Sequence, residues 1–194
     1  PNLFRNTTQI YPFEGKPDWN LITGMADDAI DYMTRIHQTQ PDKPIFIKAL
    51  AFAAGPAEGF FNQDYDFTTF QEVVASCEDA YRQAGIQNPR EEISMAEVHD
   101  CFTPTELVLM EDMGFSPRGQ AWKDEQEGRF DLEGAQPVNP DGGLKSFGHP
   151  IGASGIRMIY ENYLQLLGRA GPRQRQTPPR LGLSHNLGGM PNNH

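Results

Sequence analysis

Cysteine is scarce in this sequence, which has only Cys77 and Cys101 among its 194 residues. Two cysteines do not make the disulfide framework of a small secreted protein, and they fit a reducing compartment. We therefore expect a cytoplasmic protein. The chain begins without an initiator methionine and without a signal-peptide pattern, so we expect a fragment or a processed product.

Long apolar runs and an excess of positive charge are also missing. No run of about 18 apolar residues occurs, so we expect no membrane-spanning helix. Acidic residues outnumber basic ones by 26 to 16, giving a formal net charge of −10, which argues against a nucleic-acid partner. Only 38% of the residues are apolar, whereas 19 glycines and 16 prolines indicate much loop.

The first 44 to 46 residues differ from the rest. Residues 1–17 are polar and rich in turns, and a helix is expected from Asp18 until Pro41-Asp-Lys-Pro44 stops it. Pro1-Asn-Leu-Phe-Arg-Asn-Thr-Thr-Gln-Ile-Tyr-Pro12, Tyr32 and Pro41–Pro44 resemble an internal segment of bacterial arylsulfatases. Because that family's cysteine nucleophile and metal-ligand motifs are absent, we treat residues 1–44 as an appendage of uncertain origin without catalytic function.

Strand and helix patterns alternate from Ile45 onward. Apolar runs predict strands at 45–53, 93–99 and 181–185. Periodic apolar residues predict helices at 68–84, 103–113 and 156–167, and residues 115–138 are expected to be polar and exposed. This order predicts an α/β layer with an at least partly parallel sheet. The chain stops where a further strand is expected.

Three loop segments contain residues suited to catalysis. His99-Asp100-Cys101-Phe102 and Ser184-His185-Asn186-Leu187-Gly188-Gly189 follow two predicted strands, and His149 stands in the glycine-rich loop 139–155. Open α/β sheets usually place their chemistry at the carboxyl ends of strands. We therefore expect His149 to lie against residues 99–101 and 184–188.

The chemistry of these segments suits a carbonyl group near a thioester. Thr103-Pro104-Thr105-Glu106 predicts a helix start with Thr103 as N-cap, so the helix dipole and a nearby imidazole would favour the Cys101 thiolate. A histidine held between glycine and proline suits a general base or an oxyanion donor. Backbone N–H groups of Gly188 and Gly189 could approach a substrate oxygen closely.

Other interpretations of the same residues remain open. A strand-end histidine is often structural, and Cys77 has the place of a core residue in the middle of a helix. His99 and Cys101 lack a standard metal-ligand spacing, so we expect no metal. The glycine loop lacks the Gly-Lys-Ser/Thr ending of a P-loop, which argues against a nucleotide phosphate site.

Residues 45–194 resemble the C-terminal half of a thiolase, and the most similar subgroup is the sterol-carrier-protein-type thiolases with the bacterial lipid-transfer proteins. His99–Phe102 matches that subgroup's signature, and Asn139–Gly143 with Gly148–Gly155 matches the most specific motif of the superfamily. Ser184–Gly189 stands where ordinary thiolases have Cys-x-Gly. The resemblance implies a layered α/β fold with helices on a mixed sheet, incomplete at its C-terminal end.

The resemblance also implies roles for individual residues. His149 would stabilise the thioester oxyanion and help to activate a nucleophilic cysteine, and Cys101 would be the acid/base at the α-carbon of acetyl-CoA. His99 would position an oxyanion-hole donor. The remaining implied site residues form the second oxyanion hole and the pocket: Gly148, His185, Gly188 and Gly189. Coenzyme A is expected as a substrate, without a tightly bound cofactor.

The acyl-accepting cysteine of a thiolase belongs to the N-terminal half, which this sequence does not include. We therefore expect thiolysis of a 3-oxoacyl-CoA, or the reverse Claisen condensation, only with a chain that supplies that half. Family resemblance implies a homodimer or such a complex, and a small zinc-ribbon/OB-fold partner. The alternatives are a retro-aldolase subunit acting on a β-hydroxyacyl-CoA, whose relatives tend to lose these cysteines and histidines, and a non-catalytic assembly module.

Overall fold

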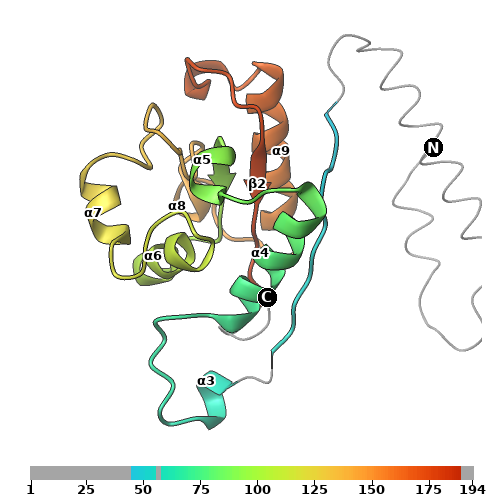
Figure 1. Cartoon of the computed structure of the whole chain (residues 1–194). Coiled ribbons are helices and arrows are strands. Elements are labelled where there is room, and N and C mark those ends of the chain that lie inside the picture. The colour runs from blue at the N-terminus through green and yellow to red at the C-terminus, as the bar shows by residue number, and fades with distance from the viewer. Residues whose placement is uncertain (1–44, 56–57, 189–194) are drawn as a thin grey trace, which may run out of the picture. The chain divides into compact units, whose positions relative to one another are not determined.

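The structure is a computed structural model that describes residues 45–55 and 58–188 (Figure 1). All of these belong to one unit, Ile45–His194. The helix expected from Asp18 and the appendage predicted for residues 1–44 lie outside the described residues, as does Gly189. The domain boundary that the sequence indicates therefore stays a prediction.

The described part of the chain alternates helices with two short strands, so the predicted α/β class is confirmed. The elements in chain order are α3 (Glu58–Phe61), α4 (Gln71–Ala84), α5 (Pro89–Glu92), β1 (Met95–Glu97), α6 (Thr103–Asp112), α7 (Ala121–Gln126), α8 (Gly143–Phe147), α9 (Ser154–Leu167), the 3-10 helix η1 (Gly171–Arg173) and β2 (Gly182–Ser184).

The two strands pair in parallel, as the sequence predicts, with Met95 opposite Gly182 and Glu97 opposite Ser184. A parallel bridge between Ala96 and Val138 adds a third segment beside β1. Because parallel segments share one direction, the residues that follow β1, Val138 and β2 all leave the sheet at the same edge. That edge receives all three candidate segments.

Side chains of β1 alternate between two layers of helices. Ala96 and Val98 belong to the hydrophobic core, which also includes residues of α4 and α6. Glu97 points to the other face, where α9 packs against both strands. In Figure 1, α9 runs alongside β2, and α6 and α7 lie on the other side of the strands.

The helix ends show where local sequence signals succeed and fail. Gly85 closes α4 in the left-handed conformation with φ 74°, as its position predicts. The predicted N-cap of α6 is wrong, because Phe102 is the N-cap and Thr103 is already helical, without a side-chain capping bond. Glu106 does not complete a capping box; it accepts a hydrogen bond from Asn139 Nδ2 at 2.9 Å.

The strand predicted at 45–53 is also wrong, because this segment has no regular secondary structure. A strand is defined by a partner, and here the carboxamide of Gln83 in α4 takes both backbone groups of Leu50 at 3.1 and 3.0 Å. The large apolar side chains of segment 45–53 are 77–86% exposed: Phe46, Ile47, Leu50 and Phe52. Apolar composition alone could not reveal whether a partner strand is present.

Residues 115–138 are not the exposed segment that their polarity predicts. Phe115 and Phe130 are buried in the core. Arg90 binds the carboxylate of Asp124 in α7 through two nitrogens, at 2.7 and 2.9 Å. Phe115, Phe130 and the Arg90–Asp124 ion pair therefore hold this polar segment against the core.

Helix α9 occupies the predicted place, but only part of its predicted apolar face is buried: Leu167 is buried, and Tyr163 and Leu164 are half-buried. Ile159 and Tyr160 are 59% and 57% exposed, whereas Glu161, Asn162 and Gln165 are buried. The amide of Asn162 donates to Leu183 O at 2.9 Å and to Ser184 Oγ at 2.8 Å, so a polar side chain anchors the helix to β2.

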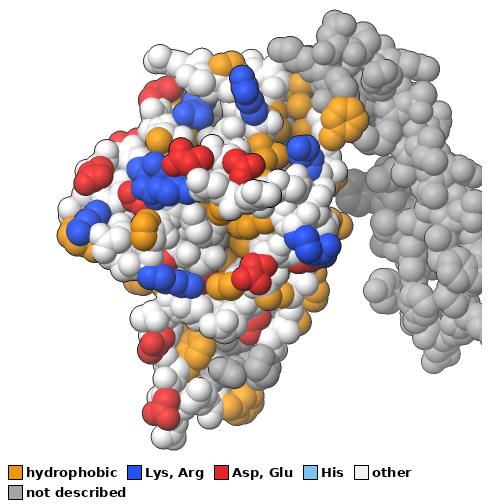
Figure 2. Space-filling model, in the orientation of Figure 1, with side chains coloured by type: hydrophobic (Ala, Val, Ile, Leu, Met, Phe, Trp, Pro, Cys, Tyr) orange, Lys and Arg blue, Asp and Glu red, His pale blue; other side chains and the backbone are white. Residues whose placement is uncertain are grey.

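The surface of the described unit carries mixed charge. Figure 2 shows acidic and basic side chains interspersed over the face with α4 to α7, so neither sign dominates there. None of the helices in the described part of the chain is long and apolar enough to span a membrane.

Burial of Glu97 makes stability depend on pH. Its pKa is raised to about 8 because burial disfavours the carboxylate, although Arg157 opposes the shift. Between the ordinary glutamate pKa of 4.5 and about 8, the folded chain binds more protons than the unfolded chain. The contribution of this group to stability therefore falls as pH rises through that window.

We predict that Glu97→Gln gains unfolding free energy relative to the parent as pH rises from about 5 to about 8, by up to ~1.4 kcal/mol per pH unit. Urea unfolding of both proteins at each pH measures the difference, in which other titrating groups largely cancel. A difference that stays constant across this range would contradict the account.

Candidate functional site

Two histidine rings meet at the shared edge of the sheet. The ring centroids of His99 and His149 lie 4.7 Å apart with an interplanar angle of 77°. His99 follows β1 by two residues and is buried, whereas His149 lies in the exposed turn between α8 and α9. The fold therefore brings together the first two of the three candidate segments.

Asn186 determines the state of the His99 ring. His99 Nδ1 lies 2.7 Å from the side-chain oxygen of Asn186. Because a carboxamide oxygen only accepts hydrogen bonds, Nδ1 carries the proton and Nε2 keeps its lone pair. Burial lowers the pKa of His99, Asn186 opposes this shift and His149 adds to it, so the ring is neutral near pH 7.

Ser154 sets the tautomer of the His149 ring in the same way. Its buried hydroxyl donates to Pro150 O at 3.1 Å, and Ser154 Oγ lies 3.1 Å from His149 Nδ1. A hydroxyl has a single hydrogen, so Ser154 Oγ accepts from His149 Nδ1–H. With Nδ1 as the donor, Nε2 is the ring nitrogen that faces away from Ser154 and could take a proton, as a general base requires.

Cys101 stands two residues beyond His99, on the segment that leads from β1 to the N-cap Phe102 of α6. It is half-buried and free of any disulfide. The intervening Asp100 turns to the loop of His149, since its Oδ1 accepts the backbone N–H of Leu144 at 2.8 Å. In the described part of the chain, no group of three or more His, Cys, Asp or Glu residues could hold a metal ion.

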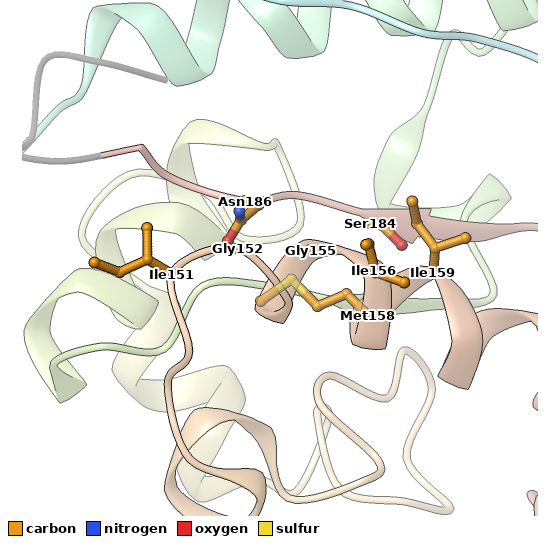
Figure 3. A pocket seen from close by; sticks show the side chains of 8 residues that line it. All are labelled: Ile151, Gly152, Gly155, Ile156, Met158, Ile159, Ser184 and Asn186. Carbon is orange, nitrogen blue, oxygen red and sulfur yellow. The ribbon is translucent and has the colours of Figure 1, made fainter. Parts of the chain in front are cut away.

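The third candidate segment, Ser184–Gly189, pairs with β1 through its backbone and lines a hollow through two side chains. His185 is buried, and its N–H donates to Glu97 O at 2.9 Å, which extends the pairing of β1 with β2. Gly188 is exposed further along the segment. Asn186 and Ser184 also line a hollow of about 290 Å³ (Figure 3). The other lining residues come from the loop and α9: Ile151, Gly152, Gly155, Ile156, Met158 and Ile159.

This hollow adjoins the histidine pair through Asn186, but His149 and Cys101 do not line it. Asn186 and Ser154 are functional candidates to which the sequence alone gave no role. Both lie inside the recognised motifs, so a polar residue next to a motif histidine was the available signal. Their partners, however, could be assigned only from distances.

Gly143 is required where the loop meets Asp100. Its φ is +64°, and a Cβ built there would overlap the Asp100 carboxylate. Gly168 has a similar φ of +72° with nothing within 4 Å of such a Cβ, so it provides a matched control for backbone strain alone.

We predict that Gly168→Ala loses about 1–2 kcal/mol of unfolding free energy from backbone strain. Gly143→Ala should lose clearly more and should speed hydrogen exchange of the Leu144 amide, because the alanine displaces Asp100. Urea unfolding and native-state hydrogen exchange measure both. Equal losses in the two variants, with an unchanged Leu144 amide, would disprove the close approach.

We also predict that Ser154→Ala removes the acceptor at His149 Nδ1 and shifts the ring toward the Nε2–H tautomer. Long-range proton–nitrogen correlation spectra of the histidine rings measure this shift. Ser146→Ala, at an exposed serine of α8, is the control and should leave the ring unchanged. An identical His149 nitrogen pattern in the Ser154 and Ser146 variants would rule out the assigned bond.

Comparisons with known proteins agree with these motifs. Residues 56–194 match the family described as Thiolase C-terminal domain-like. The acetyl-CoA acetyltransferase of Methanothermobacter thermautotrophicus is 36% identical over 76% of this chain and 37% of its own length. The benzoylsuccinyl-CoA thiolase subunit BbsB of Thauera aromatica is 33% identical over 76% of this chain and 37% of its own.

Sterol carrier protein 2 of Bos taurus is 37% identical over 63% of this chain and 21% of its own length. The chain thus spans 37% or less of these three relatives. A solved structure, the Ltp2-ChsH2(DUF35) aldolase, shares the fold with a TM-score of 0.58 at 24% identity, over 70% of this chain and 35% of that one. The chain belongs to the family of thiolase C-terminal domain-like proteins.

Proposed function

We propose that this chain is the C-terminal catalytic part of a thiolase-type acyltransferase acting on CoA thioesters. The observation that carries the proposal is the His99–His149 ring pair at 4.7 Å, with Cys101 two residues beyond His99. Relatives named acetyl-CoA acetyltransferase support the substrate class. The reaction is thiolysis of a 3-oxoacyl-CoA, or the reverse Claisen condensation.

Thiolysis breaks the bond between the α-carbon and the β-carbonyl carbon. A cysteine thiolate attacks the carbonyl carbon, the departing α-carbanion takes the proton of the Cys101 thiol, and acetyl-CoA leaves. Free CoA then accepts the acyl group from the cysteine. In this proposal His149 Nε2 removes the proton of the attacking cysteine, and the resulting imidazolium stabilises the oxyanion.

The other proposed residues surround this chemistry. His99 is a neutral ring that orients a donor in the same oxyanion hole, and Gly148 keeps the backbone beside His149 open. Backbone N–H groups of Gly188 or Gly189 serve the second oxyanion hole, and His185 supports the pocket wall. These roles rest on the motifs together with the positions of the described residues.

The attacking cysteine is not Cys77. That thiol is buried in the middle of α4, and burial raises its pKa to about 12, which keeps it protonated. We therefore propose that the nucleophile comes from an N-terminal thiolase half, on another chain or another part of the same protein. Homodimerisation, a zinc-ribbon/OB-fold partner and a cytoplasmic location belong to the same proposal.

A retro-aldolase acting on a β-hydroxyacyl-CoA is the second candidate, because the aldolase similar in structure has this fold. The two reactions differ in their need for free CoA: thiolysis consumes it and retro-aldol cleavage does not. A third candidate, the non-catalytic assembly module, would bind CoA esters without turnover or not at all.

We predict that the full chain, complemented with a cysteine-bearing thiolase half, cleaves a 3-oxoacyl-CoA only when free CoA is present. Cys101→Ala and His149→Ala should each lower kcat by about 10²- to 10⁴-fold, the usual contribution of a general acid or base. Product acetyl-CoA is measured by chromatography, and Cys77→Ala is the matched control with unchanged kcat.

An unaltered rate in Cys101→Ala would remove that residue from the mechanism. Cleavage of a β-hydroxyacyl-CoA without free CoA would favour the retro-aldolase instead. A complemented protein that turns over neither substrate would support the assembly module.

A further inference from the structure

The half-buried side chain of Arg157 joins three segments close to the histidine pair in sequence. Arg157 Nη1 donates to Glu97 Oε2 at 3.1 Å and pairs with Asp141 Oδ2. The side chains of Glu97 and Asp141 are 0% and 1% exposed, and that of Arg157 is 16% exposed. Two buried carboxyl groups from distant parts of the chain therefore meet one cation.

Each partner belongs to a segment that leads to a histidine. Glu97 is the last residue of β1, two residues before His99. Asp141 opens the loop to His149, and its other oxygen accepts the N–H of Gly143 at 2.8 Å. Arg157 itself lies in the first turn of α9, three residues after Ser154.

The ring of Phe147 adds a third contact. The Arg157 guanidinium carbon lies 5.4 Å from the centroid of that ring, which stands two residues before His149 at the end of α8. Both polar contacts of Arg157 are made by Nη1, so the contact with the Phe147 ring, and not a fork of donors, is what favours an arginine over a lysine here. The group is therefore specified by shape as well as by charge.

A gain in stability does not by itself explain why the fold buries this group of charged residues. Burying charges requires their desolvation, and replacing a buried ion pair by apolar residues of similar volume is often neutral or even stabilising. The best-attested use of a buried ionic group is to specify one arrangement among several. The arrangement specified here is that of β1, the loop 139–148 and the first turn of α9.

We propose that Arg157 is a positioning residue that sets the approach of His149 to His99. The side chain contacts no reacting atom in this account and acts through Glu97, Asp141 and Phe147. Asp100 and Ser154 hold the same loop at Leu144 and at His149, and of these three attachments only Arg157 contacts β1, the loop and α8 at once. The catalytic consequence, but not the geometry, rests on the proposed acyltransferase function.

Arg173 provides a matched control in the same region. It pairs with buried Glu161 at 2.8 Å, and its guanidinium carbon lies 5.9 Å from the centroid of the same Phe147 ring. Glu161 belongs to α9 and Arg173 to η1, so this pair does not join β1 to the loop. Its loss should affect packing without separating the histidines.

The test compares Arg157→Gln with Arg173→Gln in the full chain by nuclear Overhauser effects between the ring protons of His99 and His149. We expect the inter-ring effect to fall at least twofold in Arg157→Gln and to persist in Arg173→Gln. The pKa of His99 should also rise, because Asp100 stays beside it while His149 withdraws and water enters. Asp141→Asn, which keeps Arg157 and Glu97 together, should weaken the same effect.

An inter-ring effect equal to that of the parent in both Arg157→Gln and Asp141→Asn would overturn the proposal. If Arg157→Gln does not fold, Asp141→Asn alone decides. In the complemented enzyme, Arg157→Gln should lower kcat at least tenfold with KM unchanged, and Arg157→Lys should restore part of the loss. A parent without thiolase activity would refute the proposed function and leave the ring measurement standing.

Discussion

Parallel pairing of β1 with β2 is the constraint on which the site depends. With Glu97 opposite Ser184, the residues after the two strands leave the sheet side by side, and the bridge at Val138 brings the glycine loop to the same edge. His99 then contacts both Asn186 and His149. A shift of this register by one residue would turn His99 toward the opposite layer.

Polar contacts orient the two histidine rings at the site. The His99 ring donates from Nδ1 to Asn186 of another segment, and the His149 ring donates from Nδ1 to Ser154 of its own loop. Close to the histidine pair in sequence, buried Glu97 and Asp141 share Arg157. Such groups destabilise a fold unless they are partnered, so their presence in the segments of the two histidines indicates that the arrangement itself matters.

The sequence predicted what local chemistry determines, and it failed where a distant partner decides. Gly85 ends α4 as expected, and the strand-end positions of His99 and His185 follow from the α/β pattern. The polar burial of α9 depends on Asn162 bonding to Leu183 and Ser184, which periodicity cannot anticipate. The segment 45–53 reads as a strand, yet an apolar run does not specify the strand with which it would pair. His99 and His149 were expected to be close, but the tautomers set by Asn186 and Ser154 required distances.

The central claim is that Cys101 exchanges a proton with the α-carbon of a CoA thioester beside the histidine pair. The most direct measurement follows deuterium uptake at the acetyl methyl group of acetyl-CoA in heavy water, with the complemented protein and no second substrate. The account predicts uptake by the parent and by Cys77→Ala, and its loss in Cys101→Ala. Uptake at the parent rate in Cys101→Ala would contradict it.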